Sequence, residues 1–283
     1  IISDELGYPV EDIDIIHGDT NTTPMGWGTY GSRTTPVAGA ALVKATRKLK
    51  EKARAMAAHM MEAAVEDIEY ADGSFFVKGS PDKSQTIQTV GLMATLAWNL
   101  PPGMDPGFEE SQFYDPPNFV YPFGTHIAIV EVEAETGHVQ LKRYIAVDDC
   151  GPQINPTIVN GQIHGGIVQG VAQALFEGVV YDENGQLLTG TMMDYCMPRA
   201  DMFPTFELGH TVTPSPHHPI GVKGVGETGT IASTPTVYNA VIDALTPFGI
   251  EQIDMPMTPS RVWKAIQAAH HGAHNGNGNG SGK

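Results

Sequence analysis

The chain has 283 residues, of which 41% are apolar, and its 32 acidic and 16 basic residues leave a formal net charge of −16. A chain of this length can bury one large core or two ordinary ones, whereas its acidity disfavours nucleic acid and anionic membranes as partners, because binding phosphate groups requires clustered Lys and Arg. We expect neither a signal peptide nor a membrane span, and two cysteines without a CxxC motif indicate a reducing, cytoplasmic location.

Predicted helices alternate with short extended segments in the first part of the chain, residues 1–118. In chain order we expect a helix end at 1–7, an alternating strand at 11–19, a Gly-rich loop at 20–35, a long helix at 36–64, a hairpin with an Asp-Gly turn at 68–79 and a helix at 86–98. Thr34 or Thr35 is a candidate N-cap of the long helix, because Pro36 suits a first helical turn. Residues 99–122 are rich in proline and aromatic side chains, which predicts an ordered linker.

The second part, residues 119–268, shows the same alternation. Here we expect a hairpin with a Glu-Thr-Gly turn at 125–151, a helix at 158–176, a hairpin around 181–187, a helix at 231–248 entered at Pro235, and a strand followed by a short helix within 253–270. Residues 269–283 are of low complexity and are expected to be disordered. Long helices that alternate with hairpins favour an α+β fold with two subdomains.

One lone carboxylate, Glu227, lies in a loop of glycines, "GVKGVGETG". It could be a structural carboxylate that bonds loop N–H groups, or a buried base. The string from Gly224 to Gly229 also matches GxGxxG, and Asp254 follows where a ribose-binding acid belongs, which makes a nicotinamide-binding domain an alternative. The preceding "SPHHPIGVK" contains prolines and is no buried strand, so this alternative is remote.

Two further segments have more than one interpretation. Gly31, Ser32 and Arg33 lead into a helix N-terminus, which suits either a phosphate site or an ordinary helix start. A predicted helix carries glycines and glutamines at helical spacing, which suits either close packing of another helix or a flat ligand; these residues are Gly161, Gly165, Gly166, Gly170, Gln162, Gln169 and Gln173. The histidines are scattered without the spacing of a metal site.

Four longer strings occur in order: "HGDTNTTPMGWGTYGSRTTPVAGAAL", "NPTIVNGQIHGGIVQGVAQALFEGVVYDENG", "HTVTPSPHHPIGVKGVGETGTIASTPTVYNAVIDAL" and "IDMPMTPSRVWKAI". Together they resemble the C-terminal, molybdenum-cofactor-binding part of the molybdenum hydroxylase family, which includes xanthine dehydrogenase and aldehyde oxidase. Within this family, the four strings are most similar in sequence to the large, molybdopterin-binding subunits of aerobic carbon monoxide dehydrogenases. The resemblance covers nearly the whole chain, and it implies the α+β fold of these cofactor-binding domains. The chain opens within an element and without Met, so we expect it to be part of a longer protein.

The resemblance assigns roles to the candidate residues. The Glu of the family's "GVGE" string, here Glu227, is the base that takes a proton from a Mo–OH group; the oxygen then attacks an electron-poor carbon, and hydride passes to a Mo=S ligand. The bare loop around Gly226 leaves room where metal and substrate meet. The other cofactor-binding residues implied are Gly31, Ser32 and Arg33 on the phosphate and dithiolene side, Gln169, and Lys223. No side chain binds molybdenum directly, because the dithiolene of the cofactor holds it.

Cofactors and partners follow from the same resemblance. The nearest bacterial members carry molybdopterin cytosine dinucleotide, and they pass electrons to a [2Fe–2S] small subunit and a medium subunit with FAD, in a dimer of heterotrimers. We therefore expect the chain alone, without the N-terminal half of the large subunit, to be inactive. The alternative is a non-catalytic cofactor-binding or assembly module, or half of a split subunit. The loop whose cysteine binds copper in true carbon monoxide dehydrogenases is expected in the part of the large subunit outside this chain, so carbon monoxide stays open as a substrate. Neither Cys150 nor Cys196 lies in such a motif, and the loop "TGTIAS" after Glu227 differs from that of the carbon-monoxide-oxidising group, which favours an aldehyde or N-heterocycle.

Overall fold

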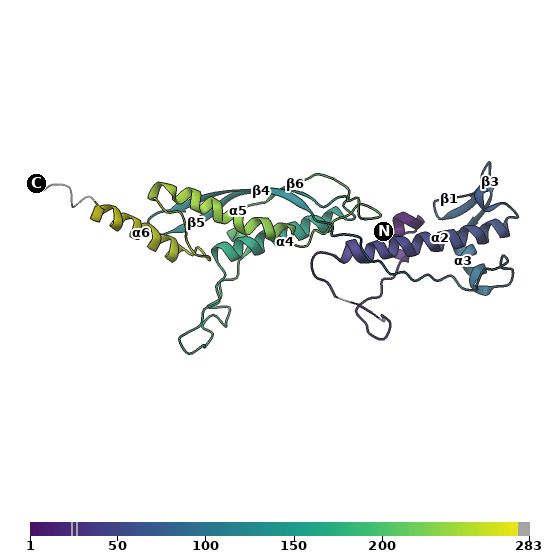
Figure 1. Ribbon diagram of the computed structural model, residues 1–283, viewed down its shortest axis with the longest axis horizontal. Coiled ribbons are helices and arrows are strands. Elements are labelled where there is room, and N and C mark those ends of the chain that lie inside the picture. The colour runs from purple at the N-terminus through teal and green to yellow at the C-terminus, as the bar shows by residue number, and fades with distance from the viewer. Residues whose placement is uncertain (24, 27, 277–283) are drawn as a thin grey trace, which may run out of the picture. The chain divides into compact units, whose positions relative to one another are not determined.

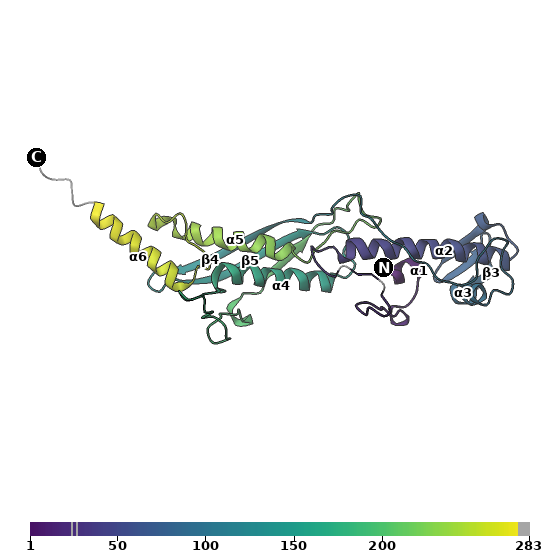
Figure 2. The same ribbon diagram turned by 60° about the horizontal axis from the view of Figure 1, so that its bottom comes forward.

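The computed structural model describes residues 1–23, 25–26 and 28–276 of the chain (Figures 1 and 2). Residue contacts divide it into two compact units. Unit 1 consists of Ile1–Phe119 and the short segment Pro216–Ile220, and unit 2 consists of Val120–Ser215 and the chain from Gly221 onward. From sequence the boundary is expected between residues 118 and 119, and nothing in the pattern foretells that 216–220 joins the first unit. The roles assigned to the two parts stay a prediction.

Within the described residues, unit 1 contains three α-helices and a small antiparallel sheet. The helices are α1 (Ile2–Leu6), α2 (Ala40–Met60) and α3 (Ile87–Leu96), and the sheet has the order β1 (Ile68–Ala71), β2 (Ser74–Val77), β3 (Ser80–Thr86). Asp72 and Gly73 join β1 to β2 with φ of +47° and +76°. Two successive positive φ values are what a type I′ hairpin turn requires, so the predicted hairpin is confirmed. Helices α2 and α3 pack their apolar faces on this sheet around the fully buried Phe75.

Two predictions about the first forty residues are wrong. Residues 11–19 form no strand: a 3₁₀ turn at Val10–Asp12 is followed by irregular chain, and the side chains of Ile15 and Ile16 are exposed. An alternating pattern forms a strand only where a neighbouring strand pairs with it. Thr34 does not cap α2 with its side chain, because it has helical dihedral angles and the chain first forms a π-helical turn at Thr35–Gly39. Residues 24 and 27 of the predicted loop lie outside the described residues.

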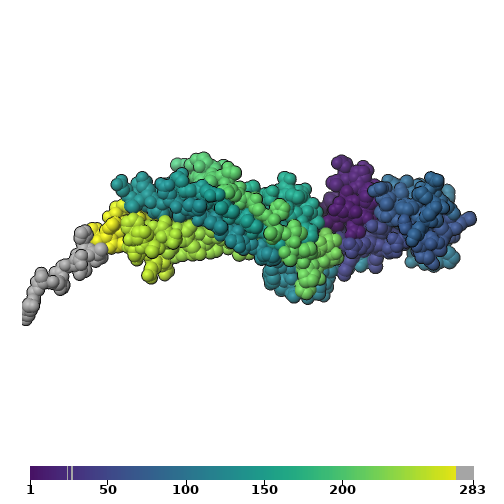
Figure 3. Space-filling view, turned by 90° about the horizontal axis from the view of Figure 1, so that it is seen from above, coloured from purple at the N-terminus to yellow at the C-terminus, as the bar shows by residue number. Residues whose placement is uncertain are grey.

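Unit 2 is a three-stranded sheet with two long helices against one face (Figures 1 and 2). Strands β4 (Phe123–Glu133) and β5 (His138–Asp149) form the predicted long hairpin, and β6 (Glu207–His210) adds to β5 in parallel. Helices α4 (Pro156–Leu175) and α5 (Thr228–Leu245) pack on each other, and α5 also contacts β4; α6 (Pro259–Gly276) follows. The β4–β5 hairpin lies at the surface of the unit (Figure 3), where Phe123, Ile127 and Ile129 are exposed.

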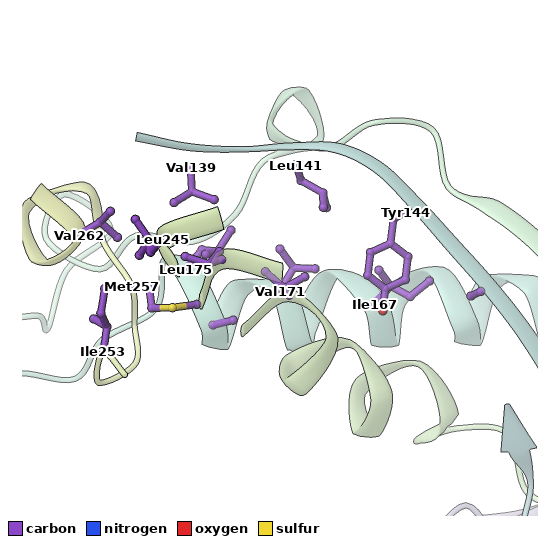
Figure 4. Packing of buried hydrophobic residues seen from close by; sticks show 14 of the residues in the cluster. Val139, Leu141, Tyr144, Ile167, Val171, Leu175, Leu245, Ile253, Met257 and Val262 are labelled. Carbon is purple, nitrogen blue, oxygen red and sulfur yellow. The ribbon is translucent and has the colours of Figure 1, made fainter. Parts of the chain in front are cut away.

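The core of unit 2 fills the space between this sheet and its helices (Figure 4). Each fully buried side chain of this size contributes roughly 1.5–3 kcal/mol relative to an exposed one. The labelled side chains come from β5, from helices α4, α5 and α6, and from the segment between α5 and α6: Val139, Leu141, Tyr144, Ile167, Val171, Leu175, Leu245, Ile253, Met257 and Val262. Apolar side chains of β5, α4, α5 and α6 therefore form one continuous core in unit 2.

Four boundaries in unit 2 differ from the prediction. Helix α5 begins at Thr228 with Pro235 inside it, rather than being entered at the proline, and no strand forms within the described part of 253–270. The hairpin around 181–187 is reduced to one bridge between Tyr181 and Leu187. Helix α6 continues to Gly276, past the predicted start of the tail at 269, and residues 277–283 lie outside the described residues. No helix within the described residues is long and apolar enough to cross a membrane.

Candidate functional site

In unit 1 the segment Gly31–Ser32–Arg33 leads into the first turn of the α2 helix region. Gly31 and Ser32 both have positive φ, +59° and +50°, so the chain reverses sharply here. The guanidinium carbon of Arg33 lies 5.6 Å from the centre of the Tyr30 ring, and the Arg33 carbonyl accepts a hydrogen bond from the Val37 N–H at 2.9 Å. A helix start beside an arginine attracts anions through its partial positive charge and the guanidinium donors. The geometry thus suits the phosphate-site interpretation of this loop.

The segment 216–220 packs against the same helix start. The His218 ring is buried, and its Nε2 lies 2.9 Å from the Pro36 carbonyl oxygen, while Nδ1 accepts a hydrogen bond from the Ile220 N–H at 3.2 Å. Because Nδ1 accepts, Nε2 must carry the proton and donate it to Pro36. Burial lowers the pKa of His218, against the smaller opposite effect of the bond to Pro36. In the sequence this histidine has the pattern of an ordinary loop residue, so its role was missed.

In unit 2 the segment Gly221–Gly229 carries Lys223, Gly226 and Glu227 together. Gly226 and Glu227 are exposed, whereas Lys223 is only 9% exposed. Glu227 occupies the N-cap position of α5 but does not cap the helix with its side chain. Glu227 is exposed in this chain because the glycines around it supply no side chains to cover it, and its role as a structural carboxylate or as a base stays a prediction. The described residues 211–223 form no strand, so no strand leads directly into Gly224 and the context of a nicotinamide-binding fingerprint is missing.

The glycines of α4 divide into two sets. A Cβ at Gly166 would lie 2.8 Å from the Thr230 nitrogen, and a Cβ at Gly170 would lie 2.0 Å from the Ser233 Oγ, so these two glycines allow α4 and α5 to pack closely. A Cβ added at Gly161 or Gly165 would meet no atom of the described residues within 4 Å. Close helix packing thus explains the first set only. The second set lies on an open face of α4, which also carries the exposed Gln169.

Lys223 is held by a carboxylate that was not foreseen from the sequence. Its Nζ lies 3.0 Å from Asp149 Oδ1 and 4.4 Å from the centre of the Phe123 ring. Asp149 is fully buried and also accepts hydrogen bonds from the Gly151 N–H, the Thr213 N–H and the Thr211 hydroxyl. Burial by itself would raise the pKa of Asp149, but these hydrogen bonds outweigh it and hold the pKa well below its usual range. Asp149 is therefore ionised at neutral pH.

A second buried polar network lies next to it. His126 Nδ1 lies 2.7 Å from the Tyr144 hydroxyl, and its Nε2 lies 3.2 Å from Asp148 Oδ2. Burial raises the pKa of Tyr144 well above its ordinary value, so the phenol stays neutral. The adjacent acids at the end of β5 thus have different partners: Asp148 contacts His126, and Asp149 contacts Lys223. The "DDCG" string at the end of a predicted strand was the available signal for both networks.

The sites predicted from sequence are therefore distributed over both units. Lys223, Gly226 and Glu227 lie on one segment, and this segment enters α5 where α5 packs on α4, the helix of Gln169. Gly31, Ser32 and Arg33 belong to unit 1.

Several characterised proteins are similar to nearly the whole chain. It is 48% identical to the carbon monoxide dehydrogenase large chain of Hydrogenophaga pseudoflava, over 94% of this chain and 33% of that protein. It is 40% identical to the nicotine 6-hydroxylase large subunit of Paenarthrobacter nicotinovorans, with the same coverage. The chain thus spans about a third of the length of these relatives.

Solved structures of related enzymes also match nearly the whole chain. The carbon monoxide dehydrogenase of Oligotropha carboxidovorans matches with a TM-score of 0.90 at 44% identity, over 96% of this chain and 34% of that one. Quinoline 2-oxidoreductase of Pseudomonas putida 86 matches with a TM-score of 0.86 at 41% identity, over 94% and 34%. The expected α+β fold is confirmed. A family model described as "Molybdopterin cofactor-binding domain" matches residues 1–204, and the chain accordingly belongs to the molybdopterin cofactor-binding domain family.

Proposed function

We propose that this chain is the molybdenum-cofactor-binding portion of a molybdenum hydroxylase large subunit and that Glu227 is its base. The observation that carries the proposal is the exposed Gly226–Glu227 pair at the start of α5, beside a helix, α4, that has an open glycine face. Such a surface suits a flat cofactor, because no Cβ stands between ligand and backbone. Relatives named as a large chain and a large subunit support a complex with further subunits.

The residues present fit the cofactor. Arg33 and the backbone around Gly31 and Ser32 would hold its phosphate groups, since a guanidinium binds phosphate through paired hydrogen bonds. Gln169 would donate a hydrogen bond from its exposed amide, and Gly226 would admit the ligand close to the chain. The cofactor, when bound, supplies a two-electron redox centre. We propose the cytosine dinucleotide form, with molybdenum held by the dithiolene rather than by side chains.

Glu227 would accept a proton at a carboxylate oxygen when substrate is oxidised. A general base works best where water is excluded, and Glu227 is exposed in this chain. The remaining wall of the pocket must therefore come from polypeptide outside this chain, which we take to be the N-terminal half of the large subunit. It follows that the chain alone would be inactive. Electrons would leave through partner subunits that carry [2Fe–2S] and FAD.

For the substrate we favour an aldehyde or an N-heterocycle. The loop after Glu227, "TGTIAS", differs from the sequence that the family resemblance implies for the carbon-monoxide-oxidising group. The relatives include a nicotine 6-hydroxylase and a quinoline oxidoreductase as well as carbon monoxide dehydrogenases. Assays with carbon monoxide, a simple aldehyde and quinoline would separate these substrate classes.

The deciding experiment starts with the complete protein that carries this chain, purified with its partners. Molybdenum is measured by mass spectrometry, and CMP is measured after acid release. Glu227→Gln should keep both at the wild-type amount and lower kcat by about 10²–10⁴-fold, the usual contribution of a general base. Glu251→Gln, at an exposed position of the same unit, is the matched control and should change neither. Absence of molybdenum and CMP from the folded, complete protein would instead favour the non-catalytic assembly module.

A further inference from the structure

Three loops of unit 2 meet at the carboxylate of Asp149. Asp149 Oδ1 accepts hydrogen bonds from the Gly151 N–H at 2.9 Å, the Thr213 N–H at 3.1 Å and the Lys223 ammonium at 3.0 Å. The Thr211 hydroxyl donates to Oδ2 at 2.9 Å. One buried carboxylate therefore joins the end of β5, the segment after β6 and the segment that leads to Glu227.

Backbone hydrogen bonds also join the three segments that meet at Asp149. The Lys223 N–H donates to the Cys150 carbonyl at 2.8 Å, and the Ser215 N–H donates to the Gly221 carbonyl at 2.8 Å. A Cβ at Gly151, which has φ of +70°, would lie only 2.4 Å from the Gly221 carbonyl oxygen. The chain around residue 221 is thus in direct contact with the end of β5, and no other residue type fits at 151 without moving it.

The far end of the Glu227 segment is fixed in a different way. A Cβ at Gly229 would lie 2.5 Å from the Ile163 carbonyl oxygen and 2.9 Å from the Ile167 nitrogen, so the first turn of α5 lies directly on α4. Between these two anchor points only the short stretch from 224 to 228 remains, and Gly226 and Glu227 are its exposed part. The position of Glu227 therefore depends on the anchors that flank it, Lys223 on one side and Gly229 on the other.

We propose that Asp149 and Lys223 are a positioning pair that holds the segment of Glu227 in place, and that Lys223 is not a cofactor ligand. This inference rests on the proposed function of Glu227 as the base. The Lys223 ammonium already faces Asp149 on one side and the Phe123 ring on the other, and its side chain is 7% exposed. An ammonium bound in this way is a fixed support for the segment, because moving it away would leave a buried carboxylate without its counter-charge.

The test compares Lys223→Met, Asp149→Asn and the double variant with wild type, in the complete protein. Met keeps the length of the lysine chain without its charge, and Asn keeps the shape of the carboxylate. Arg143→Met is the matched control, since it removes an exposed ion pair with Glu207 in the same unit. The first readout is hydrogen exchange at the Lys223 and Thr228 amides, which bond to Cys150 and Val225 carbonyls; it needs no cofactor.

We expect exchange of these amides to be about tenfold faster or more in Lys223→Met, which corresponds to about 1.4 kcal/mol of lost protection. Arg143→Met should leave it unchanged. We also expect Lys223→Met to lower kcat at unchanged molybdenum and CMP content, and the double variant to be no worse than the poorer single variant. If Asp149→Asn fails to fold, the double variant, in which neither charge is left unpaired, still tests the pairing.

Two outcomes would overturn the inference. Unchanged exchange in Lys223→Met would show that the pair does not hold the segment. Loss of molybdenum and CMP with unchanged exchange would make Lys223 a cofactor ligand. A wild-type protein without molybdenum and CMP would refute the proposed function alone, because the exchange measurement would still report on the pair.

Discussion

Gly165 and Gly166 are neighbours on α4 that should respond to alanine in opposite ways. A Cβ at Gly165 meets nothing within 4 Å among the described residues, whereas a Cβ at Gly166 would lie 2.8 Å from the Thr230 nitrogen and 2.9 Å from the Gly229 Cα. Both residues are interior to the same helix, so the intrinsic gain from replacing glycine is the same at both positions. The difference between the variants therefore isolates the close contact of α4 with α5.

The magnitudes follow from these contacts. Alanine in place of glycine inside a helix stabilises by about 1 kcal/mol, and Gly165→Ala should show this gain. At Gly166 the neighbours that must move are backbone atoms of α5, and overpacking of this kind costs about 1–3 kcal/mol. Gly166→Ala should therefore be less stable than Gly165→Ala by roughly 1–3 kcal/mol, since the helix-propensity gain cancels between them.

The assay is the free energy of local opening from hydrogen exchange of the most protected amides in α4, which reports on unit 2 without assuming that both units unfold together. Equal stability of the two variants would refute the close packing inferred at Gly166. The proposed function adds a second readout in the complete protein. If the open face of α4 receives the cofactor, Gly165→Ala should lower the content of molybdenum and CMP although it stabilises the helix.

Three other variants test separate parts of the structure. Arg33→Lys should lower the CMP content of the complete protein, because an ammonium cannot replace the paired hydrogen bonds of a guanidinium; unchanged CMP would remove Arg33 from the phosphate site. Phe75→Ala should destabilise unit 1 by about 3–5 kcal/mol in urea denaturation, as for other buried phenylalanines, and a cost well below about 1 kcal/mol would contradict its place in the core. Burial lowers the pKa of the His218 ring from 6.5, so the unfolded chain takes up a proton on this ring at a higher pH than the folded chain does. The neutral, buried His218 therefore contributes its full share to the free energy of unfolding above pH 6.5, and this contribution is lost as the pH falls from 6.5 toward the lower pKa of the folded state. In His218→Gln, whose amide can both donate to Pro36 and accept from Ile220, urea denaturation between about pH 7.5 and 5.5 should show a shallower loss of stability than in wild type, and identical slopes would contradict the buried, neutral histidine.

The sequence predicted correctly those elements whose conformation is set by residues within the element itself. The Asp72–Gly73 turn and the turn ending at Gly137, which has φ of +73°, specify hairpins through backbone angles that few other residues adopt. The long helices were also predicted from the sequence. The start of α5 was not, because Pro235 resembles a first-turn proline, while the packing of Gly229 on α4 extends the helix to Thr228.

Non-local contacts explain the rest of what the sequence did not show. Strand β6 pairs with β5, although helix α4 and a long irregular segment separate the two strands in the chain. The residues 207–210 alone therefore carry no pattern that predicts this strand. The Glu227 segment was recognised from its own residues, but its support was not, since Asp149 lies 74 residues away from Lys223. The same reasoning applies to His218, whose partner Pro36 is 182 residues distant.

The contact of His218 with Pro36 has a consequence for the synthesis of the protein. A ribosome delivers the chain from its N-terminus, yet unit 1 is complete only when residues 216–220 reach it, long after residue 119 has emerged. Strands β4 and β5 and helix α4 must therefore be translated before the start of α2 acquires its His218 contact. Until then the backbone carbonyl of Pro36 lacks its His218 donor. The maturation of the two units is thereby coupled in time, and a nascent chain halted before residue 216 would present an unfinished unit 1 to the chaperones of the cell.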